Sequence, residues 1–210
     1  LTISGFGVIS VKPDRAKIQM SIITEASTAK DAAAKNADAF SKFLQTLEQA
    51  GISRDKVATT QYSIYPVYYY PPQGQPILTG YKAEYSYTVT IIAEEMSELG
   101  RKAGEVIDLA VGAGVNQVSG IYFTVSDEAF KALQDKALIE ALKDADGRAN
   151  LIANTLGLKI LNVKSISYGA YYPIPYAAPS KGAVETATEL IPSQFQVSAS
   201  VQIVYLIGQA

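Results

Sequence analysis

The clearest strand in the chain is Lys82-Ala83-Glu84-Tyr85-Ser86-Tyr87-Thr88-Val89-Thr90-Ile91. Apolar and polar side chains alternate through the whole stretch, so we expect one face of the strand to be buried and the other to meet solvent. The preceding segment, residues 57–70, is also rich in β-forming residues and ends in Tyr-Tyr-Tyr, before two prolines. The two segments are predicted to form a long hairpin whose tip is rich in tyrosine and proline.

A strand and a helix are expected before this hairpin. Residues 16–22 alternate between apolar and polar side chains, as a half-buried strand does. Thr28, followed three residues later by Asp31, fits a capping box with the shorter acid. Gly51 stands in the usual position past a helix end. Apolar spacings of three and four predict that one face of this helix is formed by Ala33, Ala37, Phe40, Leu44 and Leu47.

The second half of the chain has the same kinds of element. Residues 95–111 carry a helical stripe, and residues 121–125 read as a strand. A longer helix is predicted over residues 127–156. A strand near residues 163–172, a long Pro/Ala/Ser tip and a last strand over residues 195–203 form a second predicted hairpin.

Matching residues indicate an internal duplication. Gly51 and Gly157 each follow a helix, and Tyr62 and Tyr168 recur at the same offset of 106 residues. Order and spacing therefore persist across several elements, as expected for a repeated unit. Chance similarity between two amphipathic α/β segments is the alternative.

We therefore predict one domain over residues 1–210. Its repeats lie at about 14–93 and 117–207, and a helix at about 95–111 joins them. The predicted fold class is α+β, with duplicated β-α-β-β units forming a mixed sheet that has the helices packed on one side.

Composition excludes several kinds of chemistry. The 210 residues include no cysteine and no histidine, which removes thiol nucleophiles, disulfides and imidazole acid-base catalysis. It also removes the usual zinc ligands, so we expect no cofactor. The net charge is −2 and no basic run is present, so no nucleic-acid partner is expected. No apolar run approaches the roughly 20 residues of a membrane-spanning helix.

Two glycines flank Phe6 in the first segment, which is rich in β-forming residues. The run Gly5-Phe6-Gly7 opens onto a strand, so it offers no helix N-terminus to a phosphate group. We interpret it as a twist or a bulge in a strand. Because residues 1–4 already read as a strand, we expect the chain to begin just after a removed leader.

Five runs of sequence, in order along nearly the whole chain, resemble the SIMPL-domain family. They are residues 4–14, 59–66, 78–81, 114–123 and 197–201. The resemblance implies an exported prokaryotic protein, periplasmic or associated with the cell envelope, with no established enzymatic activity. It also implies links to oxidative-stress defence and, for some members, large homo-oligomers; the family name comes from a kinase-associated signalling protein of animals. Phe6 departs from the family pattern, which often has an acidic residue between the two glycines.

Aromatic residues and prolines at the two predicted hairpin tips are the candidate binding residues. The first tip has Tyr68, Tyr69, Tyr70, Pro71 and Pro72, and the second has Tyr171, Tyr172, Pro173 and Tyr176. Tyrosine supplies rigid, amphipathic contact area and is enriched at interfaces. Proline stiffens a loop and lowers the entropy lost on binding. The alternatives are that the tips fold back over the core as lids, or that they touch a membrane surface.

The leading hypothesis is a non-catalytic envelope protein that self-assembles into a homo-oligomer through its hairpin tips and sheet edges. The second is a monomeric binding module for a small apolar ligand or a partner segment. An enzyme is the third, and it would have to work with Asp, Glu, Lys, Ser or Tyr. No pair of these residues stands at a diagnostic spacing, so no catalytic residue and no metal ligand is assigned.

Overall fold

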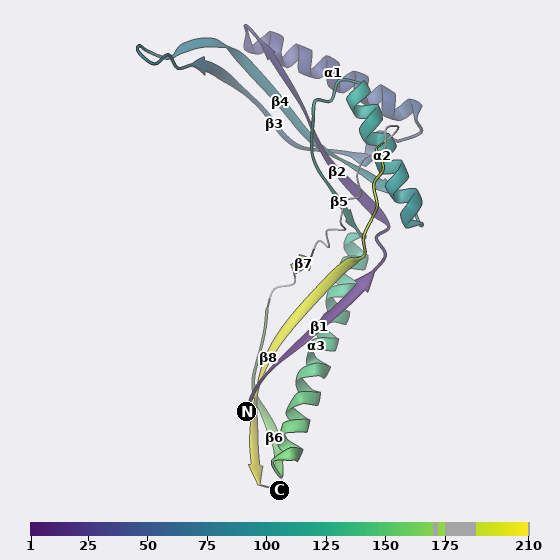
Figure 1. Ribbon diagram of the computed structural model, residues 1–210, viewed down its shortest axis with the longest axis vertical. Coiled ribbons are helices and arrows are strands. Elements are labelled where there is room, and N and C mark those ends of the chain that lie inside the picture. Colours follow the sequence, from purple (N-terminus) through teal and green to yellow (C-terminus); the bar gives the residue numbers. More distant parts are fainter. Residues whose placement is uncertain (170–171, 175–187, 210) are drawn as a thin grey trace. The chain divides into compact units, whose positions relative to one another are not determined.

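The computed structural model describes residues 1–169, 172–174 and 188–209 and divides into two compact units (Figure 1). The central unit contains Asp14–Thr124 and Ser180–Pro192. The terminal unit, which holds both chain ends, contains Leu1–Pro13, Val125–Pro179 and Ser193–Ala210. Each unit has its own sheet and its own hydrophobic core.

The sheet of the central unit has the strand order β3-β4-β2-β5, and neighbouring strands are antiparallel. The strands are β3 (Val57–Tyr69), β4 (Ile77–Ile92), β2 (Arg15–Ala26) and β5 (Gln117–Thr124). Ile18 of β2 lies opposite Val89 on one side and Ile121 on the other. This register brings apolar side chains of neighbouring strands onto one face, as the alternation of residues 82–91 predicts.

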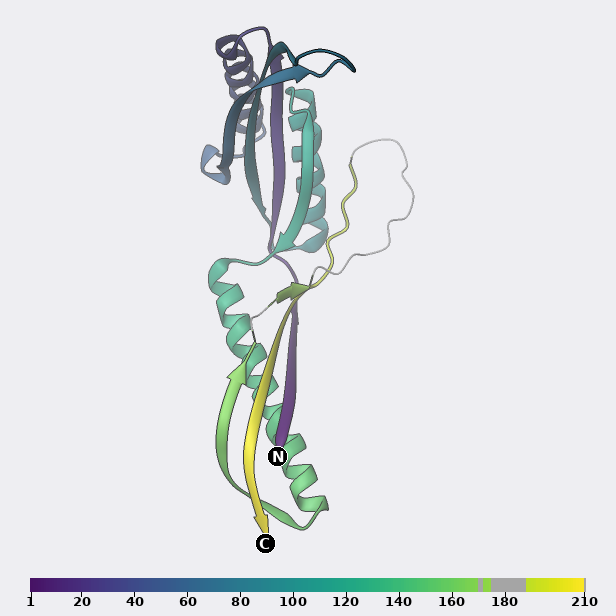
Figure 2. The same cartoon turned by 90° about the vertical axis from the view of Figure 1, so that its left-hand side faces the viewer.

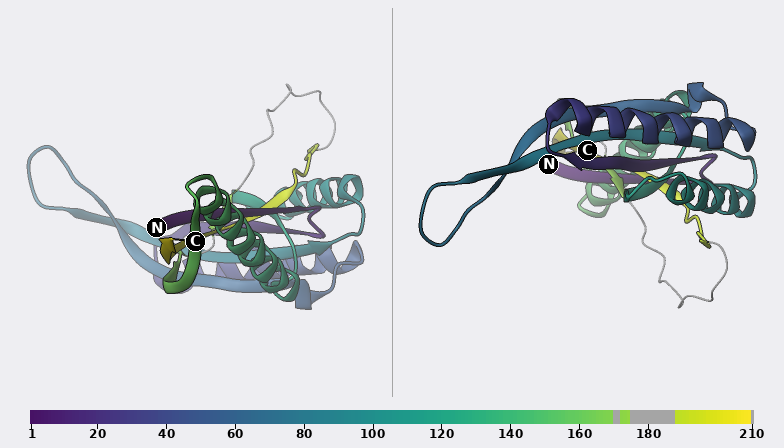
Figure 3. Two further views of the ribbon diagram at one scale, coloured as in Figure 1. Left: turned by 90° about the horizontal axis from the view of Figure 1, so that it is seen from below. Right: turned by 90° about the horizontal axis from the view of Figure 1, so that it is seen from above.

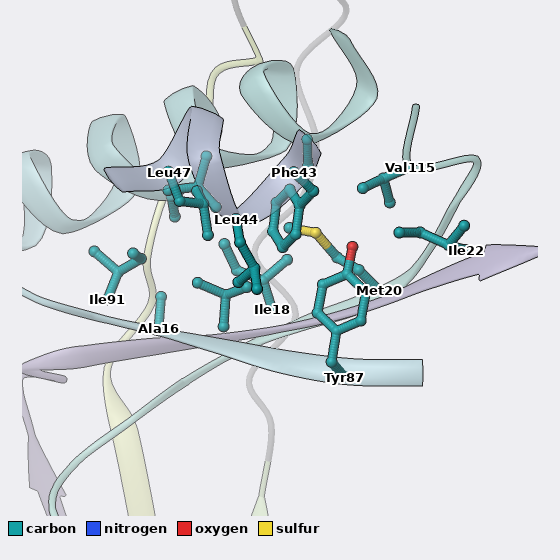
Figure 4. Close-up of a cluster of buried hydrophobic side chains, with 14 of the residues drawn as sticks. Ala16, Ile18, Met20, Ile22, Phe43, Leu44, Leu47, Tyr87, Ile91 and Val115 are labelled. Carbon is teal, nitrogen blue, oxygen red and sulfur yellow. The ribbon is translucent and has the colours of Figure 1, made fainter. Parts of the chain in front are cut away.

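Both helices of the central unit, α1 (Ala29–Gln49) and α2 (Met96–Gly112), pack on that face. A short 3-10 turn, η1 (Arg54–Lys56), leads from α1 toward β3. Figure 4 shows Phe43 and Leu47 of α1 lying over Ile18 and Met20 of β2. Burial of these side chains supplies the main stabilisation of the unit.

The start of α1 agrees with the sequence prediction, but the buried face of the helix is rotated relative to the predicted one. The hydroxyl of Thr28 accepts a hydrogen bond from the Asp31 N–H at 3.1 Å, as a capping residue does. Ala37 is exposed, whereas the buried side chains are Ala32, Asn36, Phe43, Leu44 and Leu47. The reason is Asn36, a polar residue that periodicity assigns to solvent.

Asn36 is fully buried because its amide group bonds to two strands. Nδ2 donates to the carbonyl of Ile22 in β2 at 2.8 Å and to that of Ala83 in β4 at 3.1 Å. Both partners are acceptors, so the nitrogen must face the sheet. One side chain therefore joins α1 to two adjacent strands.

The terminal unit has a second antiparallel sheet with β8 (Phe195–Gln209) at its centre. β1 (Thr2–Val11) pairs with one edge of β8, while β6 (Leu158–Tyr168) and β7 (Tyr172–Ile174) pair with the other. The long helix α3 (Asp127–Thr155) packs on this sheet (Figure 2).

Small residues bring α3 unusually close to β1. The buried stripe of the helix consists of Ala137, Ala141, Ala145, Ala149 and Ala153, with Leu133 at its start. Gly5 and Gly7 of β1 face this stripe, while Phe6 and Val8 point to the exposed face of the strand. The two glycines therefore meet a packing need, which is a different role from a twist or bulge.

The α+β class is confirmed, and in each unit the helices cover one face of the sheet. The pairing differs from expectation: the strands form two antiparallel sheets, where we predicted one mixed sheet. β5 pairs with β2 in the central sheet, and β1 takes the place beside β8. Burial explains this choice, because Ile121 and Phe123 of β5 pack against the central core. The duplication itself remains a prediction.

Candidate functional site

The β3–β4 hairpin extends beyond the rest of its sheet. β2 ends at Ala26, opposite Tyr81, so among the described residues β4 pairs only with β3 from Gly80 to Ile77. β3 and β4 continue as a two-stranded ribbon that projects past α1 (Figures 1 and 3). Thr79 closes the ribbon with a 2.9 Å hydrogen bond from its hydroxyl to the Val67 carbonyl.

This ribbon is apolar on both faces. Tyr68 pairs with Leu78, and the next pair, Tyr69 with Ile77, points to the opposite side because successive side chains of a strand alternate. These four side chains and Tyr70 are between 43% and 71% exposed. Exposed apolar patches of this kind mark contact sites.

The first tip matches the sequence prediction in position. Tyr68 and Tyr69 end β3, Tyr70 follows, and Pro71 and Pro72 begin the turn. Because the three tyrosines are exposed, they do not act as lids over the core. Gly74 has φ +116°, a conformation that only glycine adopts without strain, and it allows the chain to reverse.

Only part of the second tip falls within the described residues. Tyr172 and Pro173 lie in β7, where their backbones pair with Ser198 and Val197 of β8. Tyr171 and Tyr176 lie outside the described residues. The described residues of the two predicted tips belong to different units.

An aromatic cluster at the base of the hairpin was not predicted. The ring centroid of Tyr85 lies 4.3 Å from that of Phe40 in α1 and 5.4 Å from that of Tyr62 in β3. Thr59 and Tyr85 share a hydrogen bond of 2.7 Å between their hydroxyls. The pairing register of the hairpin is the feature that indicates this cluster, because it makes Tyr62 and Tyr85 cross-strand partners.

The same aromatic side chains border an open cavity of about 450 Å³ between α1 and β3. Asn36 and Arg54 also line it. Its wall is mainly apolar, with one guanidinium group at the side, so it suits a small apolar molecule.

Edge strands provide further contact surfaces. β3 is one edge of the central sheet, and β6 is an edge of the terminal sheet. Exposed apolar side chains follow β6, namely Leu161, Val163, Ile166 and Tyr168. The backbone of an edge strand can pair with another chain, and apolar side chains favour such pairing.

The described residues bring no catalytic constellation together. They contain no group of three or more acidic, histidine or cysteine side chains that could hold a metal ion. The Phe6 N–H and then the Arg148 guanidinium lower the pKa of Asp144 through hydrogen bonds, and both contacts are structural. Among the described residues, no helix combines the length and apolar character that crossing a membrane requires.

Comparison with known proteins agrees with the resemblance seen in the sequence. The family model SIMPL, described as a protein of unknown function (DUF541), matches residues 1–205. The chain is also similar to the 26 kDa periplasmic immunogenic protein of Brucella melitensis biotype 1, with 30% identity over 179 residues, or 83% of this chain and 68% of that protein. The protein of the same name from Brucella abortus strain S19 has the same identity and coverage. The chain belongs to the SIMPL family.

Proposed function

We propose that this chain is a non-catalytic, exported protein of the periplasm or cell envelope that self-assembles into a homo-oligomer through the β3–β4 hairpin and its sheet edges. The observation that supports this most is the ribbon of residues 66–80, which exposes apolar side chains on both faces. A surface of this kind is stabilised when another chain covers it.

The hairpin has the physical properties of an interface element. Tyr68, Tyr69 and Tyr70 offer aromatic area with few rotatable bonds, so little entropy is lost when they are fixed in a contact. Cross-strand pairing already holds the ribbon in shape before binding. Both features raise the affinity gained per contact.

The edge strands support a continuous assembly. Strand addition to β3 or β6 would satisfy backbone groups along these edges, while side chains on the strand set the register. Identical chains that use the same two surfaces form closed rings when the rotation between them closes.

The periplasmic location rests on the relatives, whose names place them there. A role in oxidative-stress defence follows from the family resemblance and is part of the proposal. Survival of a deletion strain in peroxide, complemented by the wild-type gene or by a hairpin variant, tests it. Rescue by the wild-type gene but not by the hairpin variant would link assembly to defence, and unchanged survival of the deletion strain would refute the role.

The second candidate is a monomeric binding module. The cavity beside Phe40, Tyr62 and Tyr85 favours it, because this cavity is apolar and open. An apolar fluorescent probe that binds the wild-type chain, and binds less tightly after Phe40→Ser substitution, would favour this candidate if the chain were also monomeric.

Light scattering after gel filtration tests the leading proposal. We expect a mass that is a multiple of the 22.5 kDa chain. Substituting Tyr69→Ser together with Tyr172→Ser should lower it toward one chain. Leu151→Ser is the control, because Leu151 is 68% exposed but lies on helix α3, outside the hairpin and the sheet edges. A wild-type mass of one chain at every concentration would reject the proposal.

A further inference from the structure

A segment distant in sequence lies along helix α2 in the central unit. Residues 188–192, here called the strap, run beside the helix as the yellow trace in Figure 1. The Thr188 hydroxyl donates to Asp108 Oδ1 at 2.7 Å, and the Thr188 N–H donates to Oδ2 of the same carboxylate at 3.2 Å. Leu190 packs against the central core, and Pro192 is buried.

Two glycines of α2 make room for the strap. A β-carbon on Gly104 would lie 1.9 Å from the Thr188 carbonyl oxygen, and one on Gly100 would lie 2.1 Å from that of Leu190. Any side chain at either position would push the strap away. Residues four apart lie on the same helix face, so the two glycines contact the strap from one face of α2.

The presence of these glycines needs an explanation, because glycine inside a helix lowers its stability relative to alanine. Gly112, in the last turn of the same helix, has open space around its missing β-carbon. The strap is what distinguishes Gly100 and Gly104 from Gly112.

We propose that α2 carries a peptide-docking groove, formed by Gly100, Gly104 and Asp108, and that the strap is its intrachain ligand. The groove recognises an extended segment with a hydroxyl residue, an apolar residue two positions later and a proline two positions after that. The carboxylate binds the hydroxyl residue at its side chain and its backbone, the core takes the apolar residue, and the glycine face admits the two carbonyls.

Each recognition element has a distinct physical role. One of the two contacts to Asp108 requires a hydroxyl, so valine in place of Thr188 would keep the N–H contact and lose the hydroxyl contact. Proline at position 192 restricts the backbone of the preceding residue to extended conformations, which is the form that fits the groove. The strap therefore acts as a latch that attaches the segment preceding β8 to α2.

Because the strap belongs to the same chain, a free peptide competes with it at a disadvantage. A tethered ligand has an effective concentration that reaches the millimolar range. The groove should therefore appear closed to peptides in the wild-type chain and open when the strap is altered. This inference does not depend on assembly through the hairpin.

The test uses the full chain with Thr188→Ala and Leu190→Ser, which releases the strap. The probe is a fluorescent peptide with the sequence of residues 187–193, followed by anisotropy. We expect saturable binding to the released variant, at least tenfold tighter than to the wild type. Adding Gly104→Ala should abolish this binding, whereas adding Gly112→Ala should leave it intact. Absence of saturable binding, or binding that Gly104→Ala leaves unchanged, would overturn the proposal.

Hydrogen exchange gives a second readout that needs no peptide. In the wild-type chain the Thr188 amide should be protected by its bond to Asp108. Gly104→Ala should remove that protection while the α1 amides stay protected, and Gly112→Ala should retain it. Unchanged protection of Thr188 in folded Gly104→Ala would also overturn the proposal.

Discussion

The carbonyl oxygen of Ala141 lies 2.2 Å from the point that a β-carbon on Gly5 would occupy. The same relation holds between Gly7 and the Ala137 carbonyl, at 2.1 Å. The backbones of β1 and α3 are therefore in direct contact, which requires glycine on the strand and alanine on the helix. The Gly-Phe-Gly run serves the packing of the terminal unit.

Gly5→Ala should destabilise the protein by about 1–3 kcal/mol, because the added methyl group forces α3 and β1 apart. Gly147→Ala is the matched control, since Gly147 lies in α3 with open space around it. Urea unfolding midpoints compare the two. Equal midpoints for Gly5→Ala and Gly147→Ala would contradict the close contact.

Local periodicity predicted most elements correctly, and long-range pairing was the main failure. The alternation of residues 82–91 and the spacing of α3 follow from local geometry. Nothing local indicates that β1 joins β8 almost the whole chain length away, or that β5 joins β2. The predicted buried face of α1 was wrong because Asn36 is polar and was left out of it. Its burial depends on two carbonyl partners in the sheet, which the local sequence does not reveal.

Asn36→Ala should cost more stability than removal of the helix cap. The substitution removes two hydrogen bonds that join α1 to the sheet, and each lost bond costs about 0.5–1.5 kcal/mol. Thr28→Ala, which removes the N-cap of the same helix, should cost about 1 kcal/mol. Chemical denaturation of both variants gives the comparison, and a smaller loss for Asn36→Ala would refute the bridging role.

Tyr87→Phe should stabilise the protein. The Tyr87 side chain is fully buried, and its hydroxyl has no hydrogen-bond partner among the described residues. An unpartnered buried hydroxyl costs about 1–3 kcal/mol, and phenylalanine keeps the ring contacts with Phe40 and Phe43. A lower melting temperature for Tyr87→Phe would show that the hydroxyl has a partner in solution.

Tyr87 also makes the stability of the folded protein depend on pH in the alkaline range. Burial raises the pKa of Tyr87 well above its ordinary value of 10.0. The folded state therefore holds the Tyr87 proton more tightly than the unfolded chain does. The stability that this difference contributes is fully present below pH 10.0 and is lost as the pH rises toward the higher folded-state pKa. Unfolding midpoints between about pH 9 and 11 should fall less in Tyr87→Phe than in the wild type. Identical slopes would contradict the raised pKa.

Asp144 makes the stability of the folded protein depend on pH with the opposite sign, because its contribution is lost as the pH falls. The Phe6 N–H at 3.0 Å and then Arg148 at 2.9 Å lower its pKa below the ordinary value of 3.8. Its contribution is therefore present above pH 3.8 and lost as the pH falls through the lower folded-state pKa. The stability difference between wild type and Asp144→Asn should shrink between about pH 5 and 2. A constant difference over that range would contradict the assignment.

The sequence predicted the part of the candidate site whose residues are neighbours in the chain. The tyrosines and prolines of the first tip follow one another in sequence, so the hairpin and its tip were predicted together. The aromatic cluster of Phe40, Tyr62 and Tyr85 needed the register of two strands and the position of a helix. The strap was missed for the same reason, because Thr188 and Asp108 are 80 residues apart.

Shortening the hairpin tests assembly most directly. Tyr65 and Lys82 are cross-strand partners, so an Asn-Gly turn can replace residues 66–81 and close the strands. The central core remains, because its buried side chains lie outside the deleted residues. We expect this variant to fold and to give by light scattering the mass of one shortened chain, which is below the 22.5 kDa of the full chain, while the wild type gives a multiple of 22.5 kDa. A shortened chain that forms an oligomer with the same number of subunits as the wild type would contradict assembly through the hairpin.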